Sequence, residues 1–162
     1  MVKRTIFIGQ AMPRIKNHPH DWPSLNKWLF SIGLSIDQIK TYFCYSALVD
    51  YFPGSVGGSH TVPSPEAITK ERNRLRQTLI DFNPKVVVPI GRLSIAYCLN
   101  REIEPLAKTI GKIYRENPYQ LLDTQLVVIP LPHPSGASTW TFSEQGKKLL
   151  PLALEIIKQY VI

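Results

Sequence analysis

Three short apolar runs constrain the fold of this chain most strongly. They cover residues 5–8, 85–90 and 124–131, are rich in β-branched side chains, and are each closed by a glycine or proline turn. Runs of this length and composition are typical of buried strands. Segments with helical spacing of apolar residues separate them, so we expect parallel strands with helices on both faces. The sequence predicts a three-layer α/β/α sandwich with a short parallel sheet of about four strands.

The segments between these strands carry helix signals. Ser35 and Ser64 stand where a serine side chain caps a first helical turn, and Pro65 follows at a position that favours proline. Residues 44–49 form a further extended segment, and the Gly/Ser-rich residues 55–63 are expected to be an exposed loop. The expected helices cover residues 22–32, 36–43, 64–82, 92–100 and 142–160. The last of them is expected to turn Leu149, Leu152, Ala153, Ile156 and Ile157 inward. No repeat or linker interrupts the chain, which predicts one domain over residues 1–162.

The amino-acid composition limits the kinds of binding partner and the cell compartment that we expect. The net charge of +7 favours a polyanionic partner. No apolar run reaches the ~20 residues of a membrane span, and the first residues resemble a strand rather than a signal segment, so we expect a cytoplasmic protein without membrane contact. Cys44 and Cys98 are too few for a disulfide framework or a metal cluster, and we expect both to be buried.

One histidine lies at a position in the chain where ligand-binding residues are often found. His133 stands between Pro132 and Pro134, directly after an apolar run, so its backbone is stiffened at the end of a strand. Ligand sites of open α/β sheets lie at these ends. The hydroxyl residues Ser135 and Ser138 follow, which indicates a site that handles an anion.

Two further turns are expected at the same edge of the sheet. Gly9 and Gly91 each follow a predicted strand, and glycine allows a ligand to approach the backbone closely. Backbone amides exposed in such turns can hold an anion.

Taken in order, these motifs resemble the uracil-DNA glycosylase superfamily. The glycine-led loop of residues 9–13 (GQAMP) is similar to the first family motif, and residues 133–135 (HPS) are similar to the second. Between them, residues 83–91 (NPKVVVPIG) resemble the thermophile-type branch. The resemblance covers almost the whole chain.

The resemblance implies roles for particular residues. A target nucleotide would be flipped into a pocket, where His133 would donate a hydrogen bond to the base and stabilise its developing negative charge. Gln10 would position water, with Gly9 and Ala11 lining the pocket beside it, and Trp22 would stack on the base. Trp140 or Phe142 would act as a wedge in the DNA. We expect DNA contacts at Arg14, Gly91, Arg92, Ser135, Gly136, Ser138 and Trp140.

The chain also departs from the family pattern. Many members carry a carboxylate in the first motif, where this chain has Gln10 and Ala11, so Asp21 is the nearest candidate acid, with His18 or His20 to assist it. Where the thermophile-type branch has a base-reading asparagine, Ser46 is the closest match. The four cysteines that bind an iron–sulfur cluster in that branch are absent. We therefore expect no cluster, no metal and no other cofactor.

Each candidate also has a purely structural interpretation. His133, Gln10 and the two serines could bond within their own turns, and Trp22 could be a hydrophobic staple. Asp21 could be a charge at a helix N-terminus, Ser46 a buried hydroxyl, and Trp140 or Phe142 a core residue. On the helix expected at 64–82, Arg72 falls on the apolar stripe and is expected to pair internally. The other basic side chains, Lys70, Arg74 and Arg76, are expected to form a solvated face rather than a DNA clamp, which is the alternative for them.

The sequence thus predicts a monomeric DNA glycosylase that removes uracil or a related deaminated base. Its substrate would be single- or double-stranded DNA containing the damaged base. Two alternatives stay open. One is a binding module of the same fold that has lost catalysis, and the other is a hydrolase of nucleosides or nucleotides.

Overall fold

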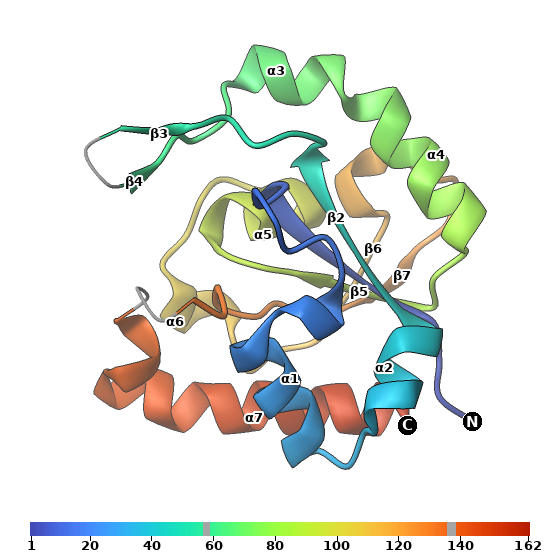
Figure 1. Ribbon diagram of the computed structural model, residues 1–162, viewed down its shortest axis with the longest axis vertical. Coiled ribbons are helices and arrows are strands. Elements are labelled where there is room, and N and C mark those ends of the chain that lie inside the picture. Colours follow the sequence, from blue (N-terminus) through green and yellow to red (C-terminus); the bar gives the residue numbers. More distant parts are fainter. Residues whose placement is uncertain (57–58, 136–138) are drawn as a thin grey trace.

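A five-stranded sheet forms the centre of the molecule (Figure 1). The computed structural model describes residues 1–56, 59–135 and 139–162. The strand order is β2-β1-β5-β7-β6, and the first four strands are parallel. The strands are β1 (Thr5–Ala11), β2 (Phe43–Val49), β5 (Val86–Pro89), β7 (Leu126–Val128) and β6 (Tyr114–Glu116). The α/β sandwich and its parallel strands are therefore confirmed.

Strand β6 was not expected. It pairs antiparallel with β7 at the edge of the sheet, so the sheet has five strands and is mixed. Its residues, Tyr-Arg-Glu, contain no apolar run because an edge strand is partly exposed. A two-stranded hairpin of β3 (Ser55–Val56) and β4 (Ser59–His60) was also missed, within a stretch expected to be loop.

The predicted helices are present, with changed boundaries. Ser35 Oγ accepts a hydrogen bond from Gln38 N, and Ser64 Oγ accepts one from Ala67 N, as expected of caps. The helix expected over 64–82 is two helices that meet at Glu71. The helices are α1 (Pro23–Ser31), α2 (Ile36–Tyr42), α3 (Pro65–Lys70), α4 (Arg72–Phe82), α5 (Arg92–Leu99), α6 (Leu106–Thr109) and α7 (Glu144–Val161). Short 3₁₀ turns are η1 (Pro19–Asp21), η2 (Pro118–Gln120) and η3 (Trp140–Phe142).

The two faces of the sheet carry different residues because side chains alternate along a strand. In Figure 1, α3 and α4 lie on one side of β2, and α1, α2 and α7 lie on the other. Phe7 of β1 and Phe43 of β2 stack at 5.7 Å between ring centres, whereas their neighbours Ile6 and Ile8 are buried on the opposite face. Each such fully buried side chain stabilises the fold by roughly 1.5–3 kcal/mol.

Two burial predictions were wrong. Leu152 of α7 was expected to face inward but is 49% exposed, because the buried stripe of this helix passes through Ala153, Leu154 and Ile157 instead. Cys98 is buried as expected, but Cys44 is only half-buried. None of the described helices is both long and apolar enough to span a membrane.

Candidate functional site

A cavity of about 410 Å³ opens at the carboxyl edge of the sheet, where the loops that follow β1, β2 and β7 meet. Loop residues after β1 and after β7 line it together, although more than a hundred residues separate them in the chain. The predicted site residues that line it are Gln10, Ala11, Arg14, Trp22, His133 and Ser135. The cavity thus brings the two sequence motifs into one site.

Aromatic rings form one wall of the cavity. Trp22 is held at the start of α1 and is 6% exposed, so one edge of its ring belongs to the core. Its ring centre lies 5.7 Å from that of Tyr45 and 5.3 Å from that of His133, which meets it edge-on at 67°. Aromatic pairs prefer such tilted or edge-on arrangements. His133 is therefore fixed against a buried ring as well as by its two prolines.

Tyr45 is a site residue that the sequence analysis missed. It lies on β2, lines the cavity, and its hydroxyl donates to Ala11 O at 3.4 Å. Burial raises the pKa of Tyr45, so its phenol stays neutral at physiological pH. Alternation along β2 means that Tyr45 and Ser46 face opposite sides of the sheet, but the sequence alone does not show which of the two faces the cavity.

The position of Gly9 is explained by this tyrosine. A Cβ atom on Gly9 would collide with the Tyr45 hydroxyl, and Gly9 does not line the cavity. The glycine in the first motif therefore makes room for Tyr45 rather than for a ligand.

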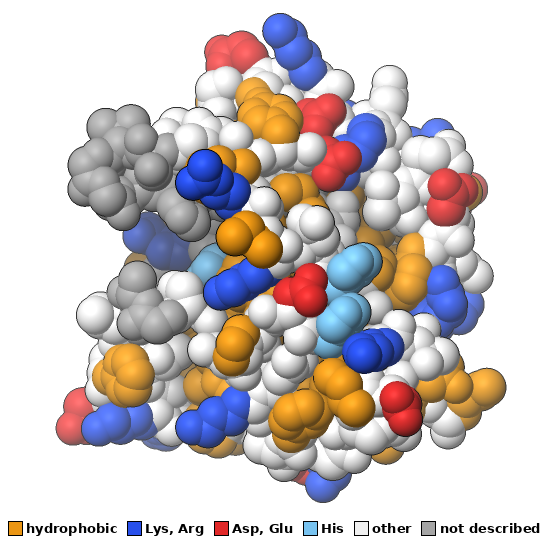
Figure 2. All heavy atoms as spheres, in the orientation of Figure 1, with side chains coloured by type: hydrophobic (Ala, Val, Ile, Leu, Met, Phe, Trp, Pro, Cys, Tyr) orange, Lys and Arg blue, Asp and Glu red, His pale blue; other side chains and the backbone are white. Residues whose placement is uncertain are grey.

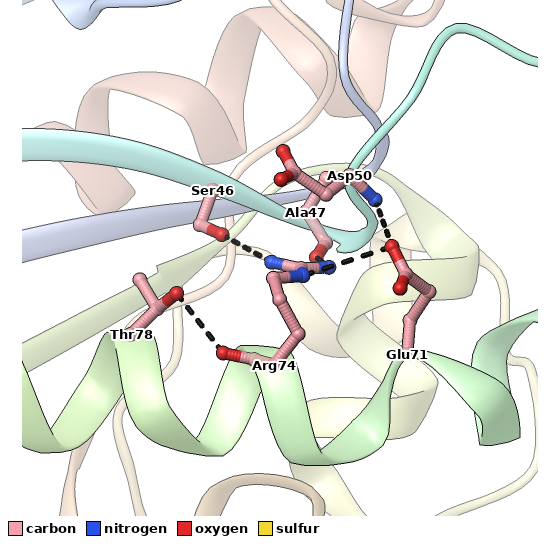
Figure 3. A network of polar contacts seen from close by, with 6 residues as sticks. All are labelled: Ser46, Ala47, Asp50, Glu71, Arg74 and Thr78. Carbon is pink, nitrogen blue, oxygen red and sulfur yellow. Dashed lines mark hydrogen bonds and ion pairs between the residues drawn. The ribbon is translucent and has the colours of Figure 1, made fainter.

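Ser46 is turned away from the cavity. Figure 3 shows its hydroxyl facing α4, where Arg74 Nη1 donates to it at 3.0 Å. Arg74 Nη2 also donates to Ala47 O at 2.7 Å, and Arg74 Nε lies 3.7 Å from Glu71 Oε1. The structure thus places Ser46 as a buried hydroxyl, out of reach of a base in the cavity.

The basic residues of α4 make more hydrogen bonds within the protein than we expected. Arg74 was expected on a solvated face but ties α4 to β2, and Arg76 Nε donates to Leu121 O at 3.0 Å. Arg72 Nη2 donates to the carbonyl oxygens of Tyr119 and Gln120, which agrees with its predicted internal pairing.

Asp21 also lies outside the cavity lining. Its Oδ2 accepts from His18 N at 3.0 Å, which caps the η1 turn, and its Oδ1 lies 3.7 Å from His20 Nε2. The rings of His18 and His20 stack at 5.1 Å, also outside the lining. The carboxylate thus caps the η1 turn by accepting this hydrogen bond.

The charge of the cavity is positive. Arg14 and Lys16 line it, and the Lys16 ammonium lies 5.2 Å from the centre of the Trp22 ring. No aspartate or glutamate is among the described residues that line it. Figure 2 shows Lys and Arg side chains near a hollow on the left of this face. A positive cavity at a sheet edge is suited to a polyanion.

The remaining predicted DNA contacts lie apart from the cavity lining. Gly91, with φ of 84°, begins α5, and Arg92 Nε donates to Glu104 O at 3.3 Å. Trp140 is half-buried against the core, whereas Phe142 is 70% exposed. Gly136 and Ser138 lie outside the described residues. Within the described ranges, no group of three or more His, Cys, Asp or Glu side chains could hold a metal ion.

Further lining residues come from segments outside the two sequence motifs. Phe52 and Pro53 follow β2, and Thr61 follows the hairpin. The parallel pairing of β1 and β2 brings residues 52 and 53 to the same edge of the sheet as the loop after β1.

Comparison with protein families gives a match over most of the chain. The family model described as the uracil DNA glycosylase superfamily matches residues 3–156. No curated protein matches the chain significantly.

Proposed function

Because this chain belongs to the uracil DNA glycosylase superfamily, we propose that it hydrolyses the N-glycosidic bond of uracil, or of a related deaminated base, in DNA. The cavity is the observation that carries the proposal, because it joins Gln10 of the first motif to His133 of the second. Its volume lies near the lower end of the roughly 300–1,000 Å³ typical of small-molecule pockets. A single base with its sugar would fit such a space.

In this proposal the base leaves the duplex and packs against the wall formed by Trp22 and Tyr45. Packing of a flat base on these rings removes apolar surface of both from water, which favours binding. The Lys16 ammonium lies over the Trp22 ring in the free protein, so stacking on that face would require the lysine to move away.

His133 stabilises the departing base. As the bond from C1′ to the base nitrogen breaks, its electron pair stays on the base, and His133 donates a hydrogen bond to the carbonyl oxygen where charge collects. Gln10 orients a water molecule toward C1′. The water oxygen bonds to C1′ and loses a proton to solvent, the base anion takes up a proton from solvent, and the products are the free base and an abasic sugar. Asp21 has no part in this step because it caps a turn.

The positive rim supports DNA as the substrate over a free nucleoside. Arg14 and Lys16 line the cavity, and such side chains neutralise phosphates. A free nucleoside has no phosphate for them to bind.

The lining also favours a second candidate, a binding module without catalysis. No carboxylate is found among the described lining residues to stabilise the sugar cation or activate water. Such a module would bind damaged DNA through the same cavity and release no base.

One experiment separates the two candidates. End-labelled single- and double-stranded oligonucleotides carrying one uracil, hypoxanthine or xanthine are incubated with the protein and then cleaved by alkali. We expect release of at least one base, and its loss in His133→Ala. His18→Ala is the matched control, because this histidine lies outside the cavity lining. Saturable binding of the same DNA without release of the base would contradict the enzyme proposal for these bases and would support the binding module.

A further inference from the structure

Three side chains of the cavity pack on the ring of Trp22 in the free protein. The centre of this ring lies 5.7 Å from that of Tyr45 and 5.3 Å from that of His133, and the Lys16 ammonium lies 5.2 Å from it. Together with the core, these neighbours leave Trp22 only 6% exposed. A base can therefore stack on the ring only after one of the three side chains has moved.

Lys16 is the neighbour that moves at the lowest cost. Tyr45 is only 9% exposed and its hydroxyl donates to Ala11 O, so it belongs to the packed core. His133 stands between two prolines, which stiffen its backbone. Lys16, in contrast, is exposed on the loop after β1. A cation over an aromatic ring at an exposed site is favoured by a factor of only about two to five, so the lysine leaves the ring readily.

A phosphate group is a partner that would draw the Lys16 ammonium away from the ring. Lys16 and Arg14 both line the cavity, and no aspartate or glutamate of the described lining competes with a phosphate for them. A lysine is a compact charge on a flexible four-carbon stem, so it can turn from the ring to a phosphate while the backbone stays in place. The same side chain can thus cover the ring in the free protein and bind the strand in the complex.

We propose that Lys16 makes the binding of a base depend on a neighbouring phosphate. It occupies the stacking face of Trp22 in the free protein and leaves that face when a DNA phosphate binds its ammonium. The substrate class is then a base within a strand, because a free base or nucleoside has to displace the lysine with no phosphate to hold it. This inference rests on the proposed function, since it assumes that the base stacks on Trp22 in this cavity.

The first test measures the affinity of the protein for the free bases uracil, hypoxanthine and xanthine by NMR titration of isotope-labelled protein. We expect Lys16→Ala to bind at least one base about two- to fivefold more tightly than the wild type, because nothing then competes for the ring face. Lys16→Arg keeps a cation over the ring and should restore the weaker binding. Lys27→Ala is the matched control, because Lys27 is an exposed lysine of α1 outside the cavity lining.

Each other result of this test overturns the inference. Equal affinities of the wild type and Lys16→Ala, or no detectable binding by either protein, would show that the lysine does not exclude the base. An equal gain in Arg14→Ala would show that the positive charge of the cavity, rather than the contact of Lys16 with Trp22, sets the affinity for a free base.

The second test supplies the phosphates. A duplex with a tetrahydrofuran abasic-site analogue provides the strand without a base at that site, and the free base is titrated into its complex with the protein. We expect the duplex to raise the affinity of the wild type for the base by about two- to fivefold more than that of Lys16→Ala, because only the wild type has the lysine to withdraw. By linkage, the base should raise the affinity for the duplex by the same factor. Equal increases in both proteins would contradict withdrawal of the lysine by a phosphate.

Both tests separate the role of Lys16 from the chemistry, because neither of them requires catalysis. If Lys16→Ala binds a free base more tightly but the wild type releases no base from DNA, the role of Lys16 stands and the proposed hydrolysis falls. If the wild type releases a base from DNA but Lys16→Ala matches it in both titrations, hydrolysis stands and the role of Lys16 falls.

Discussion

The imidazole of His133 meets the indole of Trp22 edge-on, with 5.3 Å between ring centres. The contact joins a residue of the second motif to one that begins α1, so the core determines where the histidine lies. Because Trp22 is nearly buried, any change of its ring affects both the stability of the fold and the position of His133.

Replacing Trp22 by alanine should therefore damage stability and activity together. Removal of a buried Trp typically costs about 3–5 kcal/mol. Trp22→Phe keeps an aromatic edge for His133 and should lose less of both. Urea unfolding gives the free energy of unfolding, and single-turnover assays on DNA give the release rate. Equal release rates in the two folded variants would contradict a role for the ring in placing His133.

Gly9 and Tyr45 should show strong energetic coupling. In Gly9→Ala the new methyl group would collide with the Tyr45 hydroxyl, and overpacking of this kind costs roughly 1–3 kcal/mol. Tyr45→Phe removes the hydroxyl and should recover part of that loss in the double variant. A double-mutant cycle of unfolding free energies measures the coupling. Additive effects would show that the two residues do not compete for the same space.

Several residues that line the cavity could be picked out from the sequence, but Tyr45 of its aromatic wall could not. His133, Gln10 and Trp22 stood out because prolines, a glycine turn and a helix start mark them in the chain. Tyr45 and Ser46 are adjacent, and only the register of β2 decides which one faces the cavity. A shift of one residue exchanges the two faces of a strand, and no local signal in this strand fixes its phase.

Strand β6 and the helix boundary at Glu71 were also harder to predict, because both involve contacts with residues distant in the chain. The buried strands β1 and β5 carry apolar runs, so they were recognised. Strand β6 is stabilised by pairing with β7 rather than by its own composition. Where the two helices meet, Glu71 Oε1 accepts a hydrogen bond from Asp50 N across the fold, and no helical pattern in the sequence indicates such a contact.

Ser46→Ala should leave base preference unchanged, because its hydroxyl is bonded to Arg74 on the far face of β2. Loss of one hydrogen bond to a charged group should lower stability by about 1.5–3 kcal/mol. Release rates for uracil, hypoxanthine and xanthine oligonucleotides are compared with those of the wild type. A changed order of preference would restore Ser46 as a base-reading residue.

Alkaline pH should destabilise the protein through Cys98. Burial raises the pKa of this thiol from 9.0 to about 12 in the folded protein. Between these values the unfolded chain has lost the thiol proton and the folded chain keeps it, so stability falls as pH rises above about 9. Between pH 8 and 10 the wild type should lose about 1 kcal/mol more than Cys98→Ala. Urea unfolding at both pH values measures this, and equal losses would contradict it.

Asp21 gives the sharpest test of whether a carboxylate takes part in the chemistry. Its Oδ2 caps the η1 turn by accepting from His18 N, and the residue does not line the cavity. Asp21→Asn keeps an acceptor oxygen but removes the charge, whereas Asp21→Ala also removes the cap, at a cost of about 1 kcal/mol. If the carboxylate only caps the turn, Asp21→Asn should release base at a rate within about twofold of the wild type, since proton transfer by a catalytic carboxylate contributes about a hundredfold or more. A hundredfold loss in Asp21→Asn with unchanged stability would instead show that this carboxylate activates water, and that the loop rearranges around DNA to bring it there.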